Sequence, residues 1–414
     1  MRRLSRLDGR VLAAAAVVAF LGVLLGFRGI TGSVPWATVG VAPGALSFED
    51  LRSVTSSWDC ARRGIDPFPY NPCDPFAGKV AGVRRAANYP RLWTSFSHLG
   101  LGQSATVPLG VAIAVVFFVA ALAAAGPLTL GEGAIYGAAL LAPATLLGVE
   151  RGNVDLLMFA LVVVGVLLVR RSPWAAAVPI TLAAVLKLYP AAALAIFARS
   201  RRRLAAGAVA AAVLLAYGLA TLSDIRTLRS VIPREVVNSY GAGVAAQALH
   251  DAGVGWAQSP AEVRYLRLGL LALGLVLAGL LLRWARPAGG VADERRLDFF
   301  WAGAAVYAGS YVFGSNFDYR LGFLVLCVPQ LCAWARPGSA PLPGARLALG
   351  GLVLTLWLSS SRPPLPFGLQ GWYTGLSFPP EEVINWLLFA WLAGAVVSTL
   401  PLALPERLAW RPVR

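Results

Sequence analysis

The sequence predicts an all-α polytopic membrane protein, and three observations lead to this fold class. Hydrophobic residues make up 57% of the 414 residues and charged residues only 14%, with a mean hydropathy of +0.67. Apolar runs recur along the whole chain, and basic residues gather in short clusters between them. A helix needs roughly 20 apolar residues to cross ~30 Å of hydrocarbon, because lipid offers no partner for an unpaired backbone group.

We expect twelve apolar segments to cross the membrane, which places both termini in the cytoplasm. The first segment follows Met1-Arg2-Arg3, and no small-residue cleavage site comes after it, so we expect a retained anchor and not a removed signal peptide. The twelve segments lie near residues 11–28, 107–125, 134–149, 154–169, 174–186, 189–198, 204–222, 264–283, 298–314, 321–335, 345–360 and 383–401.

The region 174–198 is expected to form a helical hairpin of short or tilted segments. Arg171 and Arg199 bracket too few residues for two full crossings. A helix from Pro173 to Lys187 rises roughly 21 Å at about 1.5 Å per residue. The tip of the hairpin, at residues 187–190, is therefore expected towards the outer leaflet.

The net charge of +16 could indicate a nucleic-acid partner, but nearly all of the 36 basic residues are arginine and many flank apolar runs. This arrangement is typical of the positive-inside rule, so it marks the cytoplasmic side and excludes nucleic acid. The clusters are Arg170-Arg171, Arg199, Arg201 to Arg203, Arg283, Arg286, Arg295-Arg296, Arg336 and the tail from Arg407 to Arg414.

The chain is expected to form a single integral membrane domain over residues 1–414. Its long connections, residues 29–106, 223–263 and 361–382, fall on the extracytoplasmic side. The first has no counterpart in the second half, whereas transporters built from repeats normally show one. This asymmetry favours chemistry on the outer face.

The first outer loop is rich in carboxylates set among aromatic residues such as Trp58 and Tyr89. One of them could act as a general base on a sugar hydroxyl, a role worth roughly 10²–10⁴-fold in rate. Asp-Pro pairs are also ordinary turn signals, so two of the acids could serve only the loop backbone. The acids are Glu49, Asp50, Asp59, Asp66 and Asp74.

The four cysteines divide into two pairs with different expected roles. Cys60 and Cys73 share the first outer loop on the oxidising side, so a disulfide that orders the loop is expected. Cys327 and Cys332 lie within an apolar segment, and we expect both to be small buried hydrophobes.

Polar clusters mark the outer ends of three further segments. Asn153 could be a helix cap, but Arg151 beside it has no such local role. Lys187 is costly in a bilayer unless it snorkels to the interface or pairs with a partner, and a phosphate is the natural partner. Arg320, in the run 315–320, could complete a phosphate clamp or anchor the interface.

Other chemistry is not indicated. The sequence contains no phosphate-binding glycine loop and no zinc-ligand cluster, and His98 and His250 are its two histidines. We therefore expect no cofactor, although Glu49 beside Asp50 leaves assistance by a divalent metal open. With no cytosolic catalytic domain, a phosphate-bearing substrate must come from the membrane or from outside.

Two groups of motifs lie between about residues 48 and 205. The first outer loop contains Asp50-Leu51, Gly64, Asp66-Pro67-Phe68 and Asn88-Tyr89-Pro90, while residues 150–153 and 187–190 form a second group. The first group resembles the first-loop signature of glycosyltransferase family 87, the bacterial polyprenol-phosphate-mannose-dependent mannosyltransferases of the GT-C class, and the second resembles its Gly-Asn and Lys-x-Tyr-Pro elements. The relatives implied include the phosphatidylinositol mannoside mannosyltransferases.

The resemblance implies a hexosyltransferase that works by inverting transfer from a polyprenyl-phosphate sugar to a glycolipid or glycan acceptor. It implies a GT-C-like fold in the bacterial plasma membrane, with Asp50 as the catalytic base. Arg151, Lys187 and Tyr189 would lie near the donor phosphate, and we add Arg320 to this group. Residues expected to contact the acceptor or the sugars are Glu49, Trp58, Tyr89, Asn153 and Asp318.

Two departures from the family pattern concern the donor sugar. Arg91 follows Tyr89-Pro90 where the family often has a second proline, and the run 315–320 replaces an element with a histidine. Mannose is expected here as the usual donor sugar of the family, and not as a deduction from these residues. The alternative function is a flippase for lipids or lipid-linked glycans, in which the intramembrane cations line a transport path. A third function, that of a non-enzymatic partner in an assembly, ranks last.

Overall fold

The computed structural model describes residues 8–77, 86–231, 238–251, 253–254, 259–284, 293–314, 316–336, 342–358 and 370–400. Several expectations lie outside these residues: Ser315, residues 361–369 of the connection 361–382, and the clusters at Arg286 and Arg407–Arg414. Within them the regular secondary structure is helical apart from two strands of two residues each. The predicted all-α class is confirmed.

Five helices of the described part are long and apolar enough to cross a membrane, and α4 with α5 adds a sixth span if this pair, bent by 48°, is counted as one. The five are α1 (Gly9–Thr31), α3 (Thr106–Ala125), α8 (Arg201–Ala220), α11 (Pro260–Trp284) and α15 (Gln370–Ser398). The bent pair is α4 (Leu130–Leu140) and α5 (Pro143–Arg151). Length and apolarity therefore support about half of the twelve expected spans.

The other expected spans contain helices that are shorter, more polar or interrupted. Three of them are apolar helices of 14 residues, which fall short of the roughly 20 needed for a straight crossing. They are α6 (Asp155–Leu168), α7 (Pro173–Leu186) and α14 (Ala345–Leu358). The remaining segments are η5 (Tyr189–Arg199), α12 (Glu294–Phe313), η6 (Asp318–Cys327) and α13 (Val328–Ala335).

The expected hairpin over 174–198 is confirmed, with α7 and η5 as its arms. Ser172 caps α7, since its hydroxyl accepts a hydrogen bond from the Ala175 amide at 3.2 Å, and Pro173 opens the helix. Lys187 ends α7 in an extended conformation. The returning arm is a 3₁₀ helix, a tighter form that rises further per residue than an α-helix.

Helix α15 begins earlier than expected. Residues 370–382 were assigned to an outer connection, yet they are helical. The prolines at 379 and 380, an ordinary boundary signal, do not end the helix.

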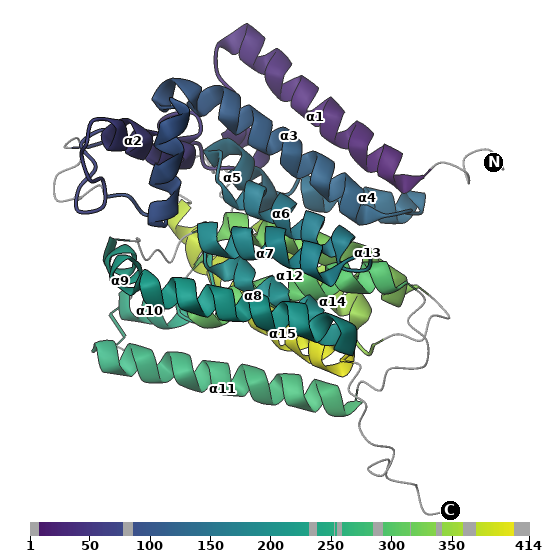
Figure 1. Cartoon of the computed structure of the whole chain (residues 1–414). Helices are drawn as coiled ribbons and strands as arrows, with labels where there is room; N and C mark the ends of the chain where they lie inside the picture. The colour runs from purple at the N-terminus through teal and green to yellow at the C-terminus, as the bar shows by residue number, and fades with distance from the viewer. Residues whose placement is uncertain are drawn as a thin grey trace, which may run out of the picture.

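The bundle has two chemically different ends. Helix α2 (Glu49–Arg62) lies at one end, together with α9 (Leu222–Val231) and α10 (Val244–Asp251), at the left in Figure 1. We call this the α2 end. It also carries a two-stranded antiparallel sheet that pairs β1 (Ser239–Tyr240) with β2 (Asn316–Phe317).

Four of the described arginines of the predicted cytoplasmic clusters form ion pairs at the opposite end. The buried carboxylate of Asp298 accepts hydrogen bonds from Arg199 and, at 2.7 Å, from Arg203. Glu132 forms ion pairs with Arg336 and, at 3.7 Å, with Arg296. These pairs join helices that are far apart in the sequence, so this end is held together by charge.

Candidate functional site

The α2 end brings together carboxylates and cations from five separate segments. The first group fastens the start of α2 to the end of α5. Arg151 donates from Nη1 to Oε2 of Glu49 at 2.8 Å, and its Nε lies 3.2 Å from Oε2 of Glu150. Glu150 also accepts a hydrogen bond from the Gly44 amide at 2.8 Å. Arg151 is thus shared between two carboxylates and holds the loop before α2 in place.

The turn between α5 and α6 needs a glycine and places Asn153 beside the first turn of α2. Gly152 ends α5 with φ +58°, and a Cβ there would lie 2.8 Å from Cβ of Phe48. Asn153 has no exposed surface, and its Nδ2 donates to Oδ2 of Asp50 at 2.5 Å. The backbone turn therefore delivers an amide to the carboxylate.

Asp50 is half-buried, and its surroundings act on it in opposite directions. Burial raises the pKa of Asp50, while the Asn153 hydrogen bond and the charges of Arg151 and Lys187 lower it, leaving a net rise. A carboxylate with a raised pKa is a stronger base once ionised.

Lys187 reaches the same site from the tip of the hairpin. Its Nζ donates to Oδ1 of Asn153 at 3.1 Å and forms an ion pair with Asp155. The ammonium also lies 5.0 Å from the ring centroid of Tyr89 and 5.6 Å from that of Tyr319, which are cation–π distances.

Arg320 completes a row of charges on the far side of Asp155. Its Nε lies 3.3 Å from Oδ2 of Asp155, and its Nη1 donates to Asn316 on β2. Its guanidinium stacks 4.7 Å from the ring centroid of Tyr189. Asp155, with almost no exposed surface, therefore holds both cations at the start of α6.

The structure thus gathers most of the residues that the sequence singled out. Trp58 and Asp318 do not belong to this row. Trp58 is buried and donates to the Trp93 carbonyl at 2.6 Å, so it packs the loop behind the site. Asp318 opens η6 and has no exposed surface.

The other acids of the first loop have local partners away from Asp50. Asp59 pairs with Arg62 and accepts from the Gln103 amide at 3.0 Å. Asp66 lies 3.2 Å from Arg91, and Asp74 accepts from the Phe76 amide at 2.9 Å. Asp66 and Asp74 also keep the turn chemistry that their Asp-Pro sequences indicate.

The loop is closed by a disulfide bond between Cys60 and Cys73, whose Cα atoms are 5.7 Å apart. Cys60 lies in the last turn of α2, so the bond ties the helix that carries Asp50 to the rest of the loop. Cys327 and Cys332 are free and buried, as expected.

Three contributing residues were not singled out for this site: Asp155, Asn316 and Tyr319. Asp155 carried a usable signal, because a carboxylate that opens an otherwise apolar helix is costly unless a cation pairs with it. Asn316 and Tyr319 meet the cations only through the pairing of β1 with β2 and the entry into η6, which no local pattern predicts.

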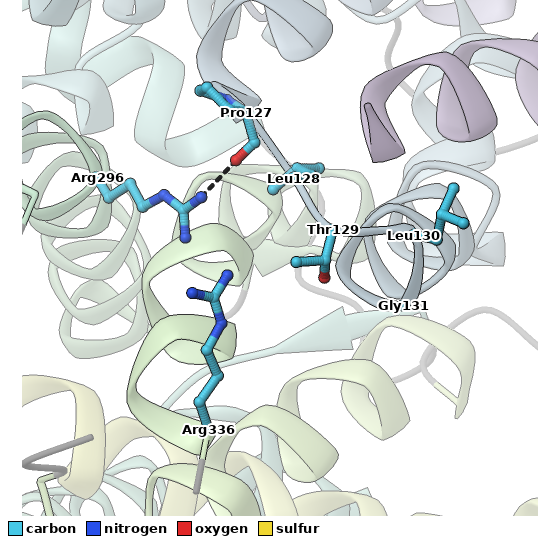
Figure 2. A pocket seen from close by; sticks show the side chains of 7 residues that line it. All are labelled: Pro127, Leu128, Thr129, Leu130, Gly131, Arg296 and Arg336. Atoms are coloured by element: carbon cyan, nitrogen blue, oxygen red, sulfur yellow. Dashed lines mark hydrogen bonds between the residues drawn. The ribbon is translucent and has the colours of Figure 1, made fainter. Parts of the chain in front are cut away.

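A pocket of about 670 Å³ lies at the opposite end (Figure 2). Its arginines are engaged there, since Arg296 donates to the Pro127 carbonyl and Arg336 to Glu132. The lining residues are Pro127, Leu128, Thr129, Leu130, Gly131, Arg296 and Arg336. This pocket is separate from the row of charges at the α2 end.

The α2 end thus combines the carboxylate of Asp50 with two cations. Lys187 is connected to Asp50 through the Asn153 amide, and Arg320 shares Asp155 with Lys187. Within the described ranges, no group of three or more His, Cys, Asp or Glu residues could hold a metal ion.

One comparison with known proteins finds a relative. The family model of glycosyltransferase family 87 matches residues 92–308, just over half of the chain. The matched range includes Asn153, Asp155 and Lys187 and begins after Asp50. No curated protein and no solved structure matches the chain.

Proposed function

The chain belongs to glycosyltransferase family 87, and we propose that it transfers a sugar from a polyprenyl-phosphate donor to a glycolipid or polysaccharide acceptor. The expected sugar is mannose, and the transfer inverts the anomeric centre. Asp50 is the general base, and the fold is GT-C-like with the α2 end on the extracytoplasmic face of a bacterial plasma membrane.

One observation supports this proposal above the others. Asp50 is connected through Asn153 to Lys187, and Lys187 shares Asp155 with Arg320. A base that takes a proton from an acceptor therefore lies in one network with two cations that can receive a phosphate. Inverting transfer from a phosphate-linked donor needs this combination.

The proposed transfer needs only Asp50, Lys187 and Arg320 in addition to the donor and the acceptor. Asp50 removes the proton of the acceptor hydroxyl as that oxygen attacks the anomeric carbon. The bond from the anomeric carbon to the phosphate oxygen breaks, and polyprenyl phosphate leaves with the bonding pair. Lys187 and Arg320 stabilise the charge that develops on the phosphate.

The aromatic residues around the cations suit a sugar and a lipid phosphate. Tyr89 and Tyr189 present their rings to Lys187 and Arg320, which fixes the positions of both cations. In this proposal Arg151 acts at the rim of the donor site while bridging Glu49 and Glu150. Trp58 and Asp318 support the sugar-binding region from beneath.

Both ends of the bundle support the proposed membrane orientation. The arginine-rich end fits the cytoplasmic face by the positive-inside rule. The disulfide at the α2 end fits an oxidising compartment. A lipid-linked donor would then present its head group to Asp50 on the outer face.

The test uses the purified full-length protein in detergent, with polyprenyl-phosphate mannose carrying a labelled sugar and a lipid extract as acceptor. We expect the label to move onto an acceptor lipid with release of polyprenyl phosphate. If no bond forms and the protein instead moves labelled donor between the leaflets of liposomes, the flippase alternative replaces this proposal.

A further inference from the structure

We propose that Asn153 is a positioning residue that selects one oxygen of Asp50 as the base and fixes that base relative to Lys187. This inference rests on the proposed role of Asp50 as the base. It assigns to Asn153 a function that neither a helix cap nor a sugar contact provides.

The orientation of the Asn153 amide follows from its donors. Its Oδ1 accepts from the Asp155 amide at 2.9 Å and from the Lys187 ammonium at 3.1 Å. Both partners are donors only, so this atom must be the oxygen. Nδ2 then necessarily faces Asp50.

The consequence for Asp50 is a difference between its two oxygens. Oδ2 receives the Asn153 hydrogen bond at 2.5 Å, and among the described residues no hydrogen bond reaches Oδ1. Oδ1 is therefore the oxygen that takes the acceptor proton. Because one planar amide contacts both Asp50 and Lys187, it sets the separation of the base from the cation.

Burial makes Asn153 a supporting group and not a contact for substrate. Its side chain has no exposed surface, and Gly152 and the start of α6 hold its backbone. Its capping bond to the Asp155 amide and its bridge to Asp50 use different atoms, so both are made at once.

The inference predicts a pH signature, because an N–H donor stabilises the ionised carboxylate and its loss raises the pKa of Asp50. The other ionisable groups around Asp50 add their own charges, so the comparison is made between variants that leave them intact. These groups are Glu49, Tyr89, Glu150, Arg151, Lys187 and Tyr319.

The experiment measures kcat/KM against pH for Asn153→Asp and Asn153→Ala, with labelled polyprenyl-phosphate mannose. Asn153→Asp keeps Oδ1 and the shape of the side chain but replaces the donor to Asp50 with an acceptor. We expect the acid limb to move up by roughly one to two pH units in the Ala variant and further in the Asp variant. Activity should recover at higher pH, with little change in the KM for the donor.

Asn71→Ala is the matched control. Asn71 is equally buried and bonds Ser56 and Ser57 within the same loop, away from Asp50. It should leave the acid limb in place even if it lowers stability. A limb unchanged in both Asn153 variants, or a loss that is equal at every pH, would overturn the inference.

The two levels of proposal can fail separately. If Asp50→Asn is inactive and the Asn153 variants keep the wild-type limb, only the positioning role is wrong. If Asp50→Asn stays active, the role of Asp50 fails, and the inference falls with it.

Discussion

The carboxylate of Asp50 lies between opposing influences, and the balance predicts how the rate depends on pH. Burial dominates and raises its pKa, against the Asn153 hydrogen bond and two neighbouring cations. A general base must be ionised, so activity is lost as the pH falls through this raised pKa. We therefore expect the acid limb of kcat/KM to lie above the range in which an exposed aspartate titrates. An acid limb of kcat/KM in the range in which an exposed aspartate titrates would contradict the role of Asp50 as the base.

In the proposed function, Lys187 supplies a cation that stabilises the phosphate of the donor. Lys187→Gln keeps a polar group of moderate length but removes the charge, while Asp155 retains Arg320. We expect the KM for the donor to rise roughly 10- to 100-fold, the range for a hydrogen bond to a charged group. Arg52→Gln is the control, since Arg52 donates to the Ser47 carbonyl at 3.0 Å in the loop before α2. Equal KM values for the two variants would reduce Lys187 to an anchor.

At this scale the sequence identified the charged residues and missed what connects them. Lys187 and Arg320 stood out because charge is costly in an apolar setting. Asp155 signalled that it needs a cation, but the identity of the partners of Asn153 and Asp155 could not be predicted, because these partners come from segments that approach only in the folded bundle.

The turn from α5 into α6 is the element on which the site depends. Gly152→Ala combines a positive φ with a Cβ placed 2.8 Å from Cβ of Phe48, the residue before Glu49 and Asp50. We expect a lower kcat as well as lower stability, because Phe48 must shift the first turn of α2. Gly32→Ala has the same kind of backbone strain, φ +76°, but open space for its Cβ. Gly32→Ala should therefore lower stability without lowering kcat. A similar loss of kcat in both variants would mean that the loss in Gly152→Ala does not come from a displacement of α2.

Elements with local signals were predicted, whereas elements defined by distant partners were not. The apolar runs placed the apolar helices, and the helix expected from Pro173 is α7 (Pro173–Leu186). The pairing of Tyr240 with Asn316 and the early start of α15 carry no period or cap that a local pattern would show.

The whole molecule is held at its arginine-rich end by a buried carboxylate that joins η5, α8 and α12. Asp298→Ala leaves Arg199 and Arg203 without this carboxylate. Breaking a buried ion pair in this way lowers the free energy of unfolding by roughly 3–5 kcal/mol. Glu294→Ala removes an acid that lies 3.6 Å from Arg199 but is 56% exposed, and an exposed pair is worth roughly 0–1 kcal/mol. Thermal unfolding in detergent should separate the two variants clearly. Identical unfolding temperatures would mean that charge does not hold this end.

At the same scale, the membrane class and the distribution of charge were predictable from composition. The number of crossings was not predictable. The 14-residue helices and the 48° bend between α4 and α5 are stabilised by packing against neighbouring helices, and this packing leaves no local pattern in the sequence. The site itself lies at the start of α6 and the end of α7, two of these short helices.

The most direct test of the account is the initial rate of sugar transfer by Asp50→Asn, compared with Asp59→Asn on the same helix. The exchange keeps the shape of the side chain but removes the basic oxygen, so the account predicts a fall of roughly 10²–10⁴-fold. Binding of the polyprenyl-phosphate donor should persist, and Asp59→Asn should stay near the wild-type rate because Asp59 pairs with Arg62. Transfer by Asp50→Asn at the wild-type rate would contradict the account.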